Sequence, residues 1–306
     1  MKIFISNLNE SWIVDRMKEE FSNYFPEIVT DDIKESDIIW IIAPWMWKKI
    51  PKKYLKSKTV VCSVHHLEEK DYSDKPLKEF NKRDKYVNFY HTISKKSKIE
   101  IQKLTSKKIV SIPFWINENI FFPIEEKSYL RSKYNLKEDS FIIGSFQRDT
   151  EGKDLKSPKL IKGPDRFVEL AKFFSIKNKN LTVLLAGYRR QYLIKRLEEE
   201  NIDYKYIEMV DFKILNELYN CLDLYIVSSR IEGGPQAILE CGITKTPVIS
   251  TDVGVASEIL ANESIFNMEN YAEAKPNIEI ALKNSTEYSL NSGMNRYLKM
   301  FEEVFK

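Results

Sequence analysis

The most constraining feature of this sequence is one stretch, residues 222–242, in which an apolar strand, a glycine pair and a helix follow one another. Leu222–Val227 is a short apolar run that ends at two serines, a pattern typical of a strand buried on both faces of a parallel sheet. Gly233 and Gly234 can adopt backbone angles closed to other residues, and Pro235 suits the first turn of a helix. The stretch therefore predicts a strand, a turn and a helix of an α/β fold, with the helix starting at about Pro235.

The start of this helix is a candidate binding site for phosphate. Its first turn would point free backbone N–H groups and the positive end of the helix dipole toward the strand ends. All nine glycines of the chain fall at or after Gly144, and backbone that approaches a phosphate closely tends to need glycine. We therefore expect a nucleotide to bind to the second half of the chain.

Length and apolar content predict two domains. The chain has 306 residues, which favours two domains of about 150 residues each, and 43% hydrophobic residues are ample for two cores. Continuous apolar strands are expected in both halves, at residues 2–5, 38–43, 59–64, 109–113, 140–146, 181–186 and 204–209. Helices are expected at residues 11–24, 95–104, 128–134, 164–174, 191–200, 270–283 and 295–305, with Ser94 as the N-cap of the second.

Charge and cysteine content exclude several classes of protein. The 48 basic and 45 acidic residues nearly balance, so the sequence has no nucleic-acid-binding footprint. The three cysteines, Cys62, Cys221 and Cys241, lie in apolar or helical patterns without metal-ligand spacing, which indicates buried reduced thiols. No apolar run approaches the roughly eighteen residues that a membrane span needs. We expect a soluble, cytoplasmic protein.

The central stretch resembles one family. Glu232-Gly233-Gly234-Pro235 with Glu240, followed by Thr246–Thr251 and by Gly254 with Glu258, is similar to the nucleotide-sugar half of retaining GT-B glycosyltransferases of the family-4 type, the glycosyl transferases group 1. The match extends over about thirty residues in the expected order, which makes it far more specific than a lone glycine motif.

The resemblance implies a fold and its domain boundaries. The implied fold is α/β of the GT-B type, with two Rossmann-like domains that face each other across a cleft. Phe114–Pro123 resembles the family's segment between the domains. We expect an acceptor-side domain over residues 1–120, a nucleotide-sugar-binding domain over residues 121–290, and a C-terminal helix over residues 291–306 that packs back on the first domain.

The resemblance also implies which cations hold the donor diphosphate. In the family, an arginine follows the opening strand of the second domain and a lysine precedes a glycine. Arg148 and Lys162 occupy these places, and we assign them catalytic roles. Lys153, Lys156 and Lys159 lie in a long charged insertion and compete with Lys162 for this role.

Two glutamates are expected to bind the donor. The resemblance implies that Glu232 hydrogen-bonds hydroxyls of the sugar and that Glu240 accepts both ribose hydroxyls. Further contacts to the nucleotide sugar are expected from the corner and from the base-contacting loop, at Gly233, Gly234, Pro235, Gln236 and Val210.

Histidines after a strand of the first domain are further candidates. His65 follows the strand that ends at Val64 and matches a family histidine near the donor sugar, so we include it among the catalytic candidates. A structural histidine is the alternative interpretation of His65. His91 lies inside the segment Val87–Ile93, and we interpret it as a core or capping residue without a chemical role.

An aromatic and lysine-rich segment, Trp45–Lys58, has two interpretations. It either docks on anionic lipid or grips a lipid-diphosphate acceptor, or it is a solvated helix face whose tryptophans pack inward. Residues assigned to the acceptor or membrane side are Trp45, Trp47, Lys48, Lys49 and His66.

The chemistry of sugar transfer indicates what the site must supply. When the bond between the anomeric carbon and the phosphate breaks, negative charge grows on the leaving diphosphate. The sequence has no convincing Asp-x-Asp pair near a predicted strand end, so we expect no metal and no other cofactor. Arg148, Lys162 and the helix start would supply the positive charge.

We therefore expect a metal-independent retaining glycosyltransferase of the hexosyltransferase type, which uses a UDP- or GDP-sugar in bacterial surface polysaccharide synthesis. Its acceptor would be a glycan or a lipid-linked glycan, and it would be either free in the cytoplasm or peripheral at the inner face of the cytoplasmic membrane. The sequence leaves the oligomeric state open.

Two other functions remain open. A GT-B sugar-nucleotide 2-epimerase needs an acidic, histidine-rich cleft, whereas this chain has three histidines. A non-catalytic GT-B subunit that partners an active transferase would fit the absence of glycine from Ser6–Glu10 and the presence of Val255 where the family often has glycine.

Overall fold

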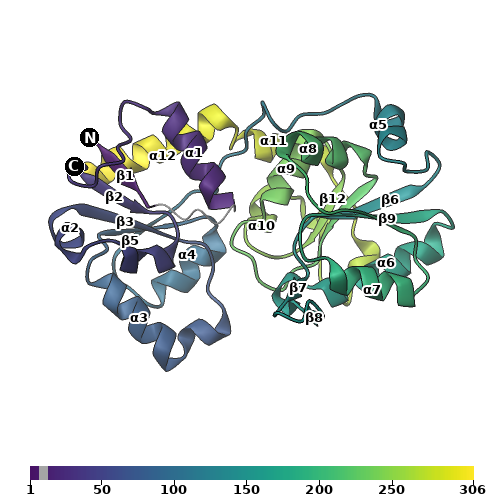
Figure 1. Ribbon diagram of the computed structural model, residues 1–306, viewed down its shortest axis with the longest axis horizontal. Coiled ribbons are helices and arrows are strands. Elements are labelled where there is room, and N and C mark those ends of the chain that lie inside the picture. Colours follow the sequence, from purple (N-terminus) through teal and green to yellow (C-terminus); the bar gives the residue numbers. More distant parts are fainter. Residues whose placement is uncertain (7–12) are drawn as a thin grey trace. The chain divides into compact units, whose positions relative to one another are not determined.

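The computed structural model describes residues 1–6 and 13–306, without the side chains of Glu69 and Lys70. The chain divides into two compact α/β units (Figure 1). The first unit consists of Met1–Trp115 and Asn291–Lys306, and the second of Ile116–Leu290. The division falls between Trp115 and Ile116.

The first unit, within its described residues, is built on a five-stranded parallel sheet. Its strands lie side by side in chain order: β1 (Ile3–Ile5), β2 (Ile38–Ile41), β3 (Thr59–Val64), β4 (Phe89–Thr92) and β5 (Lys108–Ser111). Ile3 pairs with Ile38 on one side and with Val29 on the other. The segment around Val29 therefore lies on one side of β1, and the next strand, β2, lies on the other. Such a reversal of strand order is a topological switch point.

Helices cover both faces of this sheet, which explains why its strands are continuous apolar runs. Figure 1 shows α1 (Ile13–Tyr24) and α12 (Leu290–Phe305) on one face, and α3 (Asp74–Asp84) and α4 (Lys95–Gln102) on the other. The short α2 (Lys52–Ser57) precedes β3.

The C-terminal helix α12 supplies aromatic side chains to the core of the first unit. The ring centroids of Phe301 and Trp40 lie 5.2 Å apart, and those of Tyr297 and Trp115 lie 5.1 Å apart. Rings at such separations add packing energy beyond the area that they bury. Residues 291–306 thereby complete the hydrophobic core that begins with β2.

The second unit, in the described part of the chain, has a six-stranded parallel sheet with a clear switch point. The strand order is β10 (Tyr204–Ile207), β9 (Leu181–Ala186), β6 (Phe141–Ser145), β11 (Leu224–Val227), β12 (Val248–Thr251) and β13 (Ile265–Phe266). The chain first builds outward from β6 on one side and then outward on the other side from β11. In open parallel sheets, ligands bind outside the carboxyl ends of the two strands at such a reversal.

Two helical layers cover this sheet as well. Figure 1 shows α8 (Phe212–Cys221), α9 (Gln236–Thr244) and α11 (Ile278–Thr286) on one face, and α6 (Pro164–Lys177) and α7 (Gln191–Glu199) on the other. Helices α5 (Lys127–Lys133) and α10 (Ala256–Ile259) complete the unit. A Cβ at Gly242 would lie 2.1 Å from Ser285 Oγ, so the glycine allows α9 and α11 to pack closely.

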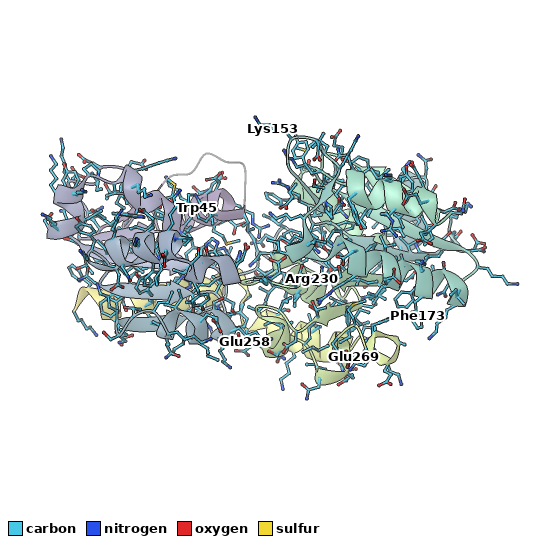
Figure 2. The ribbon with its side chains drawn as sticks, turned by 90° about the horizontal axis from the view of Figure 1, so that it is seen from below. Trp45, Lys153, Phe173, Arg230, Glu258 and Glu269 are labelled. Carbon is cyan, nitrogen blue, oxygen red and sulfur yellow. The ribbon has the colours of Figure 1, made fainter. Side chains whose placement is uncertain are left out.

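A small antiparallel hairpin follows β6. It consists of β7 (Thr150–Glu151) and β8 (Ser157–Pro158), and a 3₁₀ helix, Leu160–Lys162, connects it to α6. Figure 2 shows Lys153 at the tip of the hairpin, pointing away from the rest of the second unit.

Some sequence predictions at the element level are confirmed and others are wrong. The three cysteines are free and buried, and Ser94 Oγ accepts from the Ser97 N–H at 3.2 Å, both as predicted. The helix predicted over residues 270–283 is wrong in its first half, because Pro276 cannot donate a helical hydrogen bond and Asn277 caps the actual start of α11. The last helix begins at Leu290 rather than at residue 295.

Two features from the sequence analysis lie outside the described ranges: residues 7–10 of the stretch without glycine, and the predicted start of the first helix at residue 11. None of the helices in the described ranges combines the length and the apolar character that a membrane crossing needs.

Candidate functional site

Two loops leave the sheet of the second unit at its switch point and are bonded to each other. Ser228 Oγ donates to the Gly163 carbonyl at 2.8 Å, and the Arg230 N–H donates to the Ile161 carbonyl at 2.8 Å. Gly163 has a φ of 63°, and a Cβ there would lie 1.9 Å from the Ser228 carbonyl oxygen. Only glycine fits this position, so the glycine fixes the approach of the loop after β6 to the loop after β11.

This contact brings together two of the sequence-predicted catalytic residues. Lys162 Nζ lies 2.5 Å from Glu232 Oε1, and Ser229 Oγ donates to the same carboxylate oxygen at 3.0 Å. The side-chain amide of Gln147 donates to the Lys162 carbonyl at 2.9 Å. Both predicted residues are therefore held in place by a second contact, made by residues that the sequence prediction did not include.

Arg148 lies in the same loop as Lys162 and has an exposed side chain. Its Nε donates to the Thr150 carbonyl at 2.8 Å. Partial burial of the guanidinium, and then the neighbouring Arg189 charge, lower the pKa of Arg148. Of the competing lysines, Lys153 and Lys156 are exposed on the hairpin, whereas Lys159 is half-buried just before the 3₁₀ helix.

The corner before α9 differs from its sequence prediction in two ways. The helix starts at Gln236, and Pro235 precedes it with a φ of −63° and a ψ of 111°. Neither Gly233 nor Gly234 has a positive φ, so the prediction that the corner uses backbone angles reserved for glycine is wrong. A glycine is required instead at Gly254, which packs against the corner. Gly254 has a φ of 50°, and a Cβ there would lie 2.5 Å from the Gly233 carbonyl oxygen.

Glu240 lies in the second turn of α9 and is 5% exposed. The Tyr219 hydroxyl donates to Glu240 Oε2 at 2.8 Å and fixes the carboxylate. Burial and then the charge of Glu240 raise the pKa of Tyr219, which keeps the hydroxyl protonated as a donor. The sequence analysis did not include Tyr219 in the site, because its position in α8 is typical of a buried core residue. Val210, also a predicted contact, packs half-buried against the core beside α9.

His65 is held as a buried neutral imidazole in the first unit. Its Nε2 lies 2.9 Å from the Ile42 carbonyl, which can only accept, so Nε2 carries the proton. The Ser97 hydroxyl donates to the His65 carbonyl at 2.6 Å. Burial lowers the pKa of His65 to about 4. His91 contacts Ser63 Oγ and the Ile112 carbonyl, each at 2.8 Å, and this confirms it as a core residue.

The predicted acceptor-side residues surround one cavity of about 480 Å³ in the first unit. Trp45, Trp47, Lys48 and His66 all line it, together with His65. Residues of α3, among them Glu79, Phe80 and Arg83, form another wall. Lys49 is exposed and is not part of this lining.

The two tryptophans of this cavity differ. Trp47 is 8% exposed and packs inward, whereas Trp45 is 47% exposed. Two side chains of the lining contact carboxylates: Lys48 Nζ lies 2.5 Å from Glu79, and His66 Nε2 lies 3.6 Å from Glu68. Trp47 thus fits the interpretation of a helix face whose tryptophans pack inward. The exposed Trp45 fits the interpretation of a contact with a lipid or an acceptor.

The described ranges contain no group of three or more histidine, cysteine, aspartate or glutamate side chains placed to hold a metal ion. Arg148 and Lys162 both lie in the segment between β6 and α6.

Comparison with protein families gives a match over more than half of the chain. The model of the family described as "Glycosyl transferases group 1" matches residues 130–298. A protein named probable sucrose-phosphate synthase, from Thermosipho melanesiensis, is 28% identical over 267 residues, which are 82% of this chain and 53% of that protein. The chain thus spans about half the length of this curated relative.

Solved structures resemble the whole chain. Anabaena Alr3699/HepE in complex with UDP and glucose superposes with a TM-score of 0.75 at 12% identity, over 99% of this chain and 100% of that chain. Sucrose-phosphate synthase from Thermosynechococcus elongatus gives 0.71 at 15% identity, over 98% and 80%. A glycosyltransferase from Rickettsia africae gives 0.63 at 18% identity, over 98% and 84%. These likenesses confirm the predicted fold class, α/β with two Rossmann-like domains of the GT-B type.

Proposed function

This chain belongs to the glycosyl transferases group 1 family, and on that premise we propose that it transfers a sugar from a nucleoside-diphosphate sugar to an acceptor, without a metal ion and with retention of the anomeric configuration. The observation that carries this proposal is the contact between Lys162 and Glu232 at the switch point of the second unit. Lys162 would bind phosphate and Glu232 would bind sugar hydroxyls, and the two lie side by side at the kind of sheet edge where parallel sheets bind their ligands.

The donor class is supported by a structural neighbour. The Anabaena protein that resembles this chain over its whole length was crystallised with UDP and with UDP-glucose. We propose a UDP- or GDP-sugar donor here, with its diphosphate against Arg148, Lys162 and the start of α9. Glu240, fixed by Tyr219, would accept the ribose hydroxyls.

Stabilisation of the leaving diphosphate would be the main catalytic task of the second unit. The two cations and the backbone N–H groups at the start of α9 would contribute about 1–3 kcal/mol each. That is a share of the ~8–23 kcal/mol by which enzymes lower barriers, and the orientation of the sugar by Glu232 would add to it. Because side chains supply this positive charge, we propose that transfer needs no metal ion.

In the retaining route that the family resemblance implies, one bond forms as another breaks, and one proton moves from the acceptor to the leaving group. The acceptor hydroxyl oxygen bonds to the anomeric carbon on the face from which the diphosphate leaves, while the bond from that carbon to the phosphate oxygen breaks. The departing phosphate oxygen takes the hydroxyl proton. Such a route needs no covalent nucleophile from the protein. It is consistent with a site in which the carboxylate of Glu232 is already paired with Lys162.

We propose that the acceptor is a glycan and that the cavity of the first unit binds one of its sugar rings. A half-exposed tryptophan face, such as that of Trp45, suits the C–H face of a sugar, and the lining polar groups suit its hydroxyls. A role in surface polysaccharide synthesis, the cytoplasmic location and peripheral membrane contact stay predictions.

A panel of nucleotide sugars tests the proposed function. The purified protein is incubated with UDP-, GDP- and ADP-sugars, with and without p-nitrophenyl glycosides as acceptors and with and without EDTA. We expect one donor to release its nucleoside diphosphate faster when an acceptor is present, at a rate that EDTA does not change, with loss of activity in Glu232→Ala. Conversion of the donor to its 2-epimer, or no consumption of any donor, would contradict the proposal.

A further inference from the structure

The residue that follows the hairpin, Lys159, has a backbone position fixed by two elements. Its N–H donates to the Asp149 carbonyl at 2.7 Å, which ties the residue after β8 to the residue before β7. Asp149 in turn pairs with Arg190 at 2.9 Å, and the two side chains are 2% and 0% exposed. The Tyr192 N–H donates to Thr150 Oγ1 at 3.0 Å. The base of the hairpin is therefore anchored to α7, although its tip at Lys153 points away from the unit (Figure 2).

The 3₁₀ helix sets the direction of the Lys159 side chain. The Lys162 N–H donates to the Lys159 carbonyl at 2.8 Å, which is the hydrogen bond of a 3₁₀ turn. Side chains three residues apart in such a turn lie on the same side. Since Lys162 reaches Glu232, Lys159 points toward the same edge of the sheet.

The charges at this edge do not balance. Lys162 is paired with Glu232, and the Nε of Arg148 contacts a neutral carbonyl. Across residues 1–6 and 13–306, the Lys159 ammonium forms no ion pair and no side-chain hydrogen bond. Partial burial lowers the pKa of Lys159, and so do the charges of Lys162 and Arg148, whereas the charges of Glu151 and Glu232 offset this lowering only in part. A half-buried ammonium that forms no ion pair of its own, beside two further cations, favours the binding of an anion.

We propose that Lys159 is a third cation for the donor diphosphate and contacts it directly, beside Arg148 and Lys162. This inference rests on the proposed function, since it assigns a further binding residue to the same site. It also assigns a role to the hairpin. The hairpin leads the chain to Lys159 at the edge of the sheet, and the hydrogen bond to Asp149 holds the backbone of Lys159 there. As sugar transfer proceeds, negative charge grows on the diphosphate, so this cation would favour the departing group over the intact donor.

A binding experiment separates this role from a structural one. The dissociation constants of UDP, GDP, uridine and guanosine are measured by calorimetry for the wild-type protein and for Lys159→Ala, Lys159→Gln, Lys159→Arg and Lys156→Ala. Lys156 is the matched control, because it is an exposed lysine of the same hairpin. We expect Lys159→Ala and Lys159→Gln to weaken binding of the preferred nucleoside diphosphate about tenfold or more, which is the value of one charge-assisted contact. Binding of the matching nucleoside should not change.

Lys159→Arg should stay within about threefold of the wild type, and Lys156→Ala should equal it. The salt dependence of diphosphate binding should be shallower in Lys159→Ala than in the wild type. Wild-type affinity for the diphosphate in both neutral variants would overturn the inference and leave the proposed function intact. Equal loss of diphosphate and nucleoside binding would also overturn it, because it would show a structural role. Failure of the wild-type protein to bind any of the nucleotides would overturn both.

Discussion

The two units of this protein share an architecture but differ in the chemistry at the carboxyl edges of their sheets. In the second unit, glycines and backbone hydrogen bonds hold the edge loops together, and basic side chains gather beside them. In the first unit, the edge has aromatic rings, the buried His65 and the ion pair of Lys48 with Glu79. Of the nine glycines of the chain, Gly293 is the single one in the first unit.

Under the proposed function, this difference would suit the two units to two kinds of ligand. Close approach of backbone and an excess of cations suit phosphate groups. A cavity with an exposed ring and neutralised charges suits a ligand that is recognised by shape and hydroxyl groups. The comparison predicts that substitutions in the two units affect different substrates, and that the units respond differently to acid.

The largest expected effect concerns the anchor of the hairpin in the second unit. Arg190→Ala leaves Asp149 buried without its partner, and we expect a loss of about 3–5 kcal/mol in the free energy of unfolding, measured by urea denaturation. The matched control is Arg230→Ala, which breaks the ion pair of Arg230 with Asp165, whose side chains are both 34% exposed. That change should cost less than about 1 kcal/mol. Equal costs for the two variants would show that Arg190 is not a buried anchor.

The next largest effect tests whether the diphosphate binds to the second unit. Lys162→Ala should lower kcat/KM for the donor roughly 10²–10³-fold, because a preorganised charge at the leaving group is removed. Lys162→Arg should retain a substantial part of the activity. Steady-state release of nucleoside diphosphate measures both variants. A loss below about fivefold in Lys162→Ala would place the diphosphate elsewhere.

Acid should destabilise the first unit selectively. Burial lowers the pKa of His65 and of His91 to about 4, below the unfolded value of 6.5. Between these pH values the unfolded chain binds protons that the folded chain does not, so stability falls as the pH falls from 6.5 toward 4. The cost reaches on the order of 3 kcal/mol per histidine.

Tryptophan fluorescence measures this effect in the first unit, because all five tryptophans of the chain lie between residues 12 and 115. Urea denaturation at pH 7 and at pH 4.5 should give a smaller difference for His65→Gln than for the wild-type protein. An unchanged difference in His65→Gln would contradict the prediction.

The smallest effect tests the cavity of the first unit. Trp45→Ala should raise the KM for a p-nitrophenyl glycoside acceptor about tenfold and leave the donor KM unchanged, because the lost ring contacts one substrate only. Trp45→Phe should recover part of this loss. Vesicles of phosphatidylglycerol and phosphatidylcholine provide the alternative test, and loss of vesicle binding with an unchanged acceptor KM would favour the membrane interpretation.

Much of the fold was predictable because its signals are local. Strands β3 and β9 have the bounds expected from their apolar runs, since both faces of each are buried. Lys162 and Glu232 were predicted separately from their motifs, and the structure places them in contact. The helix expected from residue 270 begins instead at Ile278, because Pro276 cannot donate a helical hydrogen bond and Asn277 caps the start of α11.

The remaining contacts depend on residues far apart in the sequence. Asp149 meets Arg190, and Tyr219 meets Glu240, through the packing of α7, α8 and α9. No spacing rule connects such pairs. The role of Gly254 was likewise hidden, because the need for glycine comes from a loop about twenty residues earlier in the chain.

The central claim is that the second unit binds a nucleoside diphosphate at the switch point between β6 and β11. A crystal structure of the protein with the nucleoside diphosphate that it releases tests this claim most directly. The account predicts that the diphosphate lies within hydrogen-bonding distance of Lys162 Nζ and of the backbone N–H groups at the start of α9. A nucleotide bound in the cavity beside Trp45, with the corner before α9 unoccupied, would contradict it.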